Sequence, residues 1–61
     1  MNAATTAVWR NHAAAARVDL ETAMFTRAKE GILLRLRDAV ANAQVAIGVL
    51  EMDEEPNDEQ D

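Results

Sequence analysis

The segment TRAKEGILLRLR, residues 26–37, decides between two folds for this chain. Its glycine, Gly31, either ends one helix and lets the chain fold back, or lies inside one long helix. Arg27 and Lys29 precede the glycine and suit the negative end of a helix dipole. A turn at this position gives an antiparallel pair of helices, whereas an uninterrupted helix needs a partner along its whole length.

Apolar residues on both sides of Gly31 follow the heptad spacing of packed helices. The second half of the chain spaces them by 4, 3, 4 and 3 residues: Leu36, Val40, Ala43, Ile47 and Leu50. The first half repeats this spacing with smaller side chains: Trp9, Ala13, Ala16, Leu20 and Ala23. Steps of seven from Trp9 arrive at Arg37, one position past Leu36, so the two patterns differ in phase by one residue. A turn near Gly31 explains this phase change.

We therefore predict an all-α fold, a two-helix antiparallel hairpin with its turn near Gly31, which assembles into a dimeric helical bundle. The predicted segments are a flexible N-terminus at residues 1–5, a hairpin at 6–52 with helices at 6–28 and 32–52, and a disordered acidic tail at 53–61. One long helix in a coiled coil is the alternative. It stays open because a helix that begins at Ile32 has no side-chain N-cap, and a glycine inside a helix costs only about 1 kcal/mol relative to alanine.

The chain is too short to bury a large core by itself. It has 61 residues, and a domain of ~60 residues buries only about 60% of the surface that its unfolded chain exposes. No cysteine is present to form a disulfide, and the single histidine leaves no cluster for a structural metal. The remaining support is another chain, so we expect a homo-oligomer, most simply a dimer, or a complex with a partner protein.

A second apolar row in the C-terminal half indicates that this helix is covered on two sides. The row consists of Leu34, Ala41, Val45 and Val49, on roughly the opposite side of the helix from Leu36 and its heptad. We expect the heptad of Leu36, Val40, Ile47 and Leu50 to face the first helix of the same chain. The second row would then meet another molecule. The predicted interface residues are Leu34, Val45, Val49, Trp9 and Phe25.

Motifs for catalysis or ligand binding are absent from the sequence. It has no glycine-rich phosphate loop, no cysteine pair and no HExxH motif. His12 stands alone, and a lone histidine near a helix start is usually a surface or packing residue. We predict no catalytic residues, no cofactor and no metal. The expected function is that of a small non-enzymatic protein interaction module, an adaptor, inhibitor or co-chaperone, that acts through apolar helix faces.

Basic residues around the predicted turn support an alternative function. A dimeric hairpin that binds nucleic acid, most simply RNA, would contact phosphates through this cluster: Arg27, Lys29, Arg35 and Arg37. No aromatic residue lies among these cations to stack on bases, and the formal net charge of the whole chain is −5. Binding of nucleic acid is therefore the second hypothesis.

Charge and hydropathy also bear on where the chain acts. All six basic residues lie within the first 50 residues, whereas residues 51–61 contain seven of the eleven acids. No apolar run approaches the ~20 residues needed to span a bilayer, so we expect no membrane partner. The N-terminal residues interrupt their apolar run with Arg10 and His12, unlike a secretory signal. These features predict a cytoplasmic protein.

Overall fold

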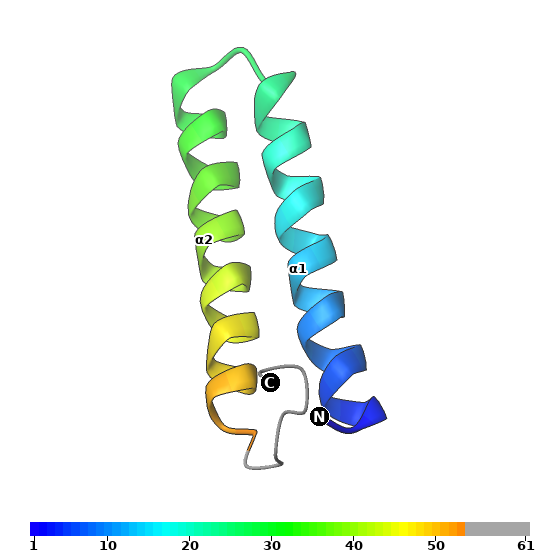
Figure 1. The fold of residues 1–61 in the computed structure, drawn as a ribbon. Coiled ribbons are helices and arrows are strands. Elements are labelled where there is room, and N and C mark those ends of the chain that lie inside the picture. The colour runs from blue at the N-terminus through cyan, green and yellow to red at the C-terminus, as the bar shows by residue number, and fades with distance from the viewer. Residues whose placement is uncertain (54–61) are drawn as a thin grey trace, which may run out of the picture.

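Two antiparallel α-helices make up the computed structural model of the chain (Figure 1), in which residues 1–53 are described. Helix α1 spans Ala3–Met24 and helix α2 spans Lys29–Glu51, and the two pack along their length. The predicted all-α hairpin is confirmed, and the alternative of one continuous helix is wrong. Of the predicted acidic tail, only Asp53 lies within the described residues.

Helix α1 begins three residues earlier than the sequence pattern indicates. Asn2 is its N-cap, and the side-chain Oδ1 of Asn2 accepts a hydrogen bond of 2.7 Å from the backbone N–H of Thr5. The hydroxyl of Thr6 donates to the backbone carbonyl of Asn2 at 3.0 Å. The bond from Thr5 satisfies one of the backbone N–H groups that a helix start leaves unpaired. With this cap, α1 covers residues 3–5 of the segment predicted to be flexible.

The chain turns at residues 25–28, before Gly31. The backbone N–H groups of Phe25 and Thr26 donate to the carbonyls of Thr22 and Ala23, and the Thr26 hydroxyl donates to the Thr22 carbonyl at 2.7 Å. These bonds end α1 without a residue in the left-handed region, since no described residue has a positive φ. The predicted turn at Gly31 is therefore displaced toward the N-terminus.

Gly31 lies in the first turn of α2, and its lack of a side chain has a different use there. A Cβ atom at this position would lie 2.9 Å from Cγ2 of Thr26, closer than a real contact allows. The glycine thus gives the turn room to pass over the start of α2. The N-cap position of α2, Ala28, makes no side-chain hydrogen bond, but Glu30 in the first turn places a negative charge at the positive end of the helix.

Alanine fills the contact between the two helices. The buried residues among those described are Ala16 and Ala23 of α1 and Ala39 and Ala46 of α2, seven positions apart on each helix. No described large side chain is fully buried. Small side chains let two helices approach closely, but they contribute little buried apolar area.

The heptad predicted to face α1 lies outside this contact. Leu36 is 38% exposed, Val40 55% and Ile47 54%, and Leu50 is also exposed. The prediction was wrong because it ranked the stripes of α2 by side-chain size. In the structure, α2 turns its alanine stripe toward the alanine stripe of α1, and the larger side chains remain at the surface.

Substitution of the two glycines tests the close approach at the turn. Gly48 has open space around it, so Gly48→Ala should raise the free energy of unfolding by about 1 kcal/mol through helix propensity. Gly31→Ala should give no such gain, because its new methyl group meets Thr26. Urea unfolding followed by circular dichroism at one fixed protein concentration measures both.

A third substitution separates this steric effect from other causes. Thr26→Ser removes Cγ2 and keeps the hydroxyl that bonds to the Thr22 carbonyl. In the Thr26→Ser background, Gly31→Ala should regain most of the stabilisation that Gly48→Ala provides. If Gly31→Ala is as stabilising as Gly48→Ala in the wild-type background, the close approach does not exist.

Candidate interaction surface

Large apolar side chains of α2 lie on two faces, one on each flank of the alanine contact. At 3.6 residues per turn, the heptad of Leu36 lies roughly a quarter turn from Ala39 and Ala46, and the row of Leu34 lies roughly a third of a turn away in the other direction. We call the first flank, with the adjoining side of α1, the front face, and the second the back face.

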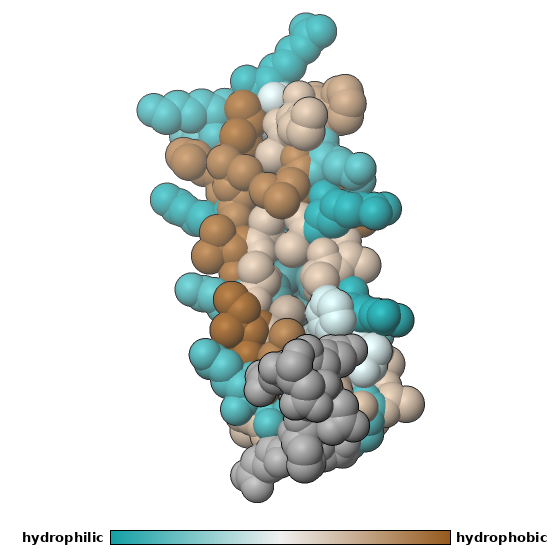
Figure 2. Space-filling model, viewed as in Figure 1, coloured by the Kyte–Doolittle hydropathy of each residue, from teal (hydrophilic) through white to brown (hydrophobic). Residues whose placement is uncertain are grey.

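The front face carries the longer apolar stripe. Its exposed members on α2 are Leu33, Leu36, Val40, Ile47 and Leu50, and helical geometry adds Leu20 and Met24 from α1. Figure 2 shows this face: a brown column of strongly hydrophobic atoms follows α2, paler side chains lie beside it, and hydrophilic side chains line both edges. A shallow hollow of about 260 Å³ opens beside the column, lined by Leu33, Leu36, Arg37, Val40, Ala41 and Gln44.

The back face holds three of the five residues predicted to form the interface. Leu34 and Val45 are exposed there, and Val49 is half-buried. Val49 shares a hollow with Val8 of α1, so both helices contribute to this face. The sequence-based grouping of Leu34, Val45 and Val49 on one side of the helix agrees with their positions in the structure.

The two aromatic residues predicted for the interface lie elsewhere. Phe25 is 84% exposed in the turn, at one end of the hairpin. Trp9 is half-buried near the start of α1, where the guanidinium carbon of Arg10 lies 5.7 Å from the centre of its ring. The Trp9 indole nitrogen is buried and has no hydrogen-bond partner among the described residues. The five residues therefore do not form one continuous site.

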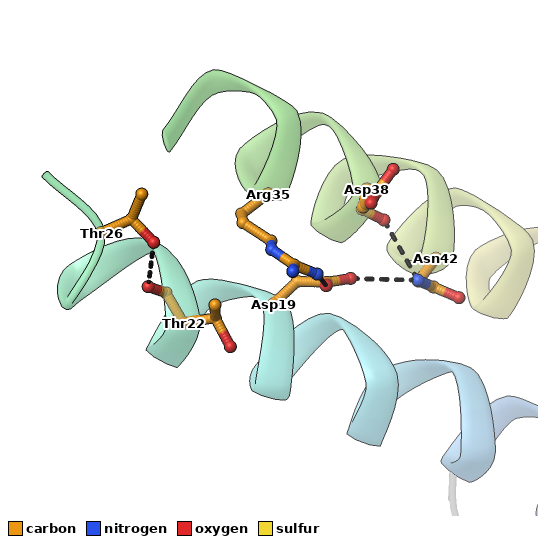
Figure 3. Close-up of polar contacts among 6 residues, drawn as sticks. All are labelled: Asp19, Thr22, Thr26, Arg35, Asp38 and Asn42. Carbon is orange, nitrogen blue, oxygen red and sulfur yellow. Dashed lines mark hydrogen bonds and ion pairs between the residues drawn. The ribbon is translucent and has the colours of Figure 1, made fainter. Parts of the chain in front are cut away.

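A polar cluster crosses the helix contact beside the alanines, and Asn42 is at its centre (Figure 3). The Asn42 side-chain nitrogen donates to a carboxylate oxygen of Asp19 at 3.4 Å and to the backbone carbonyl of Asp38 at 3.1 Å. The ring Nδ1 of His12 lies 3.1 Å from the Asn42 side-chain oxygen, which can only accept a hydrogen bond. A guanidinium nitrogen of Arg35 lies 3.8 Å from the Asp19 carboxylate.

Sequence reasoning missed this cluster, although its spacing was visible. His12 and Asp19 are seven residues apart, as are Arg35 and Asn42. The first pair lies four residues before Ala16 and Ala23, and the second pair four before Ala39 and Ala46, so each helix alternates polar and alanine positions in one heptad stripe. Polar residues that repeat every seven positions, next to alanines that repeat every seven positions, could have predicted this cluster. The search for large apolar side chains did not consider them.

The four basic residues proposed to bind nucleic acid do not converge on one side. Arg35 lies toward α1 and contacts Asp19, whereas Arg37, two positions later, lies on nearly the opposite side of α2. Arg27 is in the turn, and Lys29 is the first residue of α2. The cations share one end of the hairpin but no single binding surface.

Other kinds of site find no support in the described part of the chain. Residues 1–53 contain no group of three or more histidine, cysteine, aspartate or glutamate side chains placed to hold a metal ion. Neither helix is long and apolar enough to cross a membrane. No protein-family model, curated protein or solved structure matches the chain.

Substitution of Asn42 tests whether the polar cluster stabilises the hairpin. Asn42→Ala removes three polar contacts and leaves the part-buried Asp19 with fewer donors, so we expect a loss of about 1–2 kcal/mol in the free energy of unfolding. Gln44→Ala, at an exposed position two residues along the same helix, is the matched control and should change it by less than about 0.5 kcal/mol. Urea unfolding provides the measurement, and equal effects at the two positions would show that the cluster contributes nothing specific.

Proposed function

We propose that this chain is a small non-enzymatic protein interaction module, an adaptor, inhibitor or co-chaperone, which binds other proteins through its apolar helix faces. The supporting observation is the distribution of side chains by size. The two helices contact each other through alanine, while the large aliphatic side chains of α2 are exposed on two flanks of the hairpin.

This distribution is costly for a protein that remains alone. Fully burying one Val, Leu or Ile side chain contributes about 1.5–3 kcal/mol, and the hairpin obtains only part of this contribution on α2, where most of these side chains are 38–58% exposed. Contiguous exposed apolar surface bordered by polar residues is typical of protein interfaces. The faces run along straight helices, so they suit another helix laid alongside in a groove or bundle.

The alternative, binding of nucleic acid, has weaker support in the geometry. Phosphate contacts need cations that face one duplex or loop together, and here Arg35 is engaged by Asp19 while Arg37 lies on another side of α2. We therefore retain protein binding as the proposed function and make nucleic acid an outcome of the experiment below.

Affinity capture from the native organism, followed by mass spectrometry, tests the proposal. Two variants remove one face each: Leu34→Glu with Val45→Glu on the back, and Val40→Glu with Ile47→Glu on the front. At least one pair should reduce recovery of a specific partner by tenfold or more, since tenfold corresponds to about 1.4 kcal/mol. Circular dichroism checks that each variant remains helical.

The matched control adds the same two negative charges away from both faces. Ala7→Glu with Ala14→Glu changes two exposed positions on the outer side of α1, and recovery should stay at the wild-type level. Failure to recover any partner other than the chain itself would contradict the proposal. So would nucleic acid that copurifies, is released by salt and is lost when Arg27 and Arg37 are replaced by Glu.

A further inference from the structure

We propose that the front face is covered by a second copy of this chain, in an antiparallel dimer whose two α2 helices cross near Val40. The inference rests on the proposed function, in which the apolar faces are interfaces, and it names the occupant of one of them. The turn of each hairpin then lies beside the open end of the other, so the four helices form a bundle.

The exposed apolar stripe of the front face is the first argument. Its α2 members are 38–55% exposed: Leu33, Leu36, Val40, Ile47 and Leu50. A continuous apolar stripe that polar residues border is typical of a protein interface.

The second argument is that the apolar stripe on α2 is complementary to the same stripe on a second copy that runs in the opposite direction. When two such helices run antiparallel about Val40, that residue meets its own copy. Leu33 then lies opposite Ile47 of the second copy, and Leu36 lies near Ala43 of the second copy, so a large side chain faces a small one. On α1, the same face carries Leu20 and Met24, which add apolar area to the contact between the other pair of helices. A two-fold symmetric interface requires this kind of self-complementarity.

Charge favours the antiparallel stacking of the two copies over the parallel one. Arg27 and Lys29 lie at the turn end of the hairpin, and Glu51 lies at the open end. None of these three has an ion-pair partner within residues 1–53. Antiparallel stacking brings Lys29 toward Glu51 of the second copy, whereas parallel stacking brings like charges together at both ends.

Single cysteines give a direct test of this geometry, because the chain has no native cysteine. In the proposed dimer, the two copies of Val40→Cys face each other across the symmetry axis. A disulfide needs a Cα–Cα separation of about 4.4–6.8 Å, which is about the separation of facing residues in two packed helices. Mild oxidation of dilute Val40→Cys protein should therefore convert most of it to a linked dimer. Val45→Cys, on the back face, is the matched control and should remain unlinked.

Light scattering of the wild-type protein measures the oligomeric state independently. It should give twice the chain mass of 6.7 kDa, and Val40→Glu with Ile47→Glu should halve this mass or leave the chain unfolded. A monomeric wild type at ~100 μM, well above a micromolar dissociation constant, would overturn the dimer. So would linkage through Val45→Cys and none through Val40→Cys.

The outcomes also separate this inference from the proposed function. A monomer that still captures another protein through either face would refute the dimer and keep the interaction module. A dimer linked through Val40→Cys that captures no other protein would keep the dimer and refute the module. The Val40→Cys variant stays informative even where the glutamate variants fail to fold, because it introduces no charge into the interface.

Discussion

The alanine contact between α1 and α2 is the constraint on which the other features of this structure depend. Ala16, Ala23, Ala39 and Ala46 let the two helices approach closely, and none of them fills much volume. Since this stripe occupies the space between the helices, every large aliphatic side chain must lie on a flank. The same contact that brings the helices together therefore leaves part of the hydrophobic stabilisation unused within one chain.

The polar cluster supplies what the alanines lack, which is a preference for one alignment. Alanine stripes can slide past each other with little change in packing. Asn42, however, contacts both His12 and Asp19 in one register of the two helices only. The cluster is only partly buried, but it acts in the way that a polar residue in a helix interface selects the register of a coiled coil. Alanine thus sets how near the helices lie, and Asn42 with its partners sets which residues face each other.

Much of the fold could be predicted from the sequence, and the misplaced helix boundaries share one cause. The two heptad patterns and their difference in phase predicted an antiparallel hairpin, which the structure confirms. The turn precedes Gly31 because Thr22, Ala23 and Thr26 can end α1 by hydrogen bonds that require no glycine. The start of α1 was placed too late because the cap by Asn2 lies outside the apolar pattern. In each case a local hydrogen bond, invisible to hydrophobic periodicity, set the boundary.

The sequence by itself determined that the chain forms two helices with apolar rows repeating every seven residues, because helix propensity and heptad spacing are local properties. It also grouped Leu34, Val45 and Val49 correctly on one side of a helix. Only the tertiary structure decided which stripe of α2 faces α1. Spacing specifies which residues share a face, but the rotation of a helix about its axis depends on the turn, on close approach of alanines and on the partners of Asn42. For that reason Leu36, Val40, Ile47 and Leu50, which were predicted to face α1, lie at the surface together with the row that was predicted to be exposed.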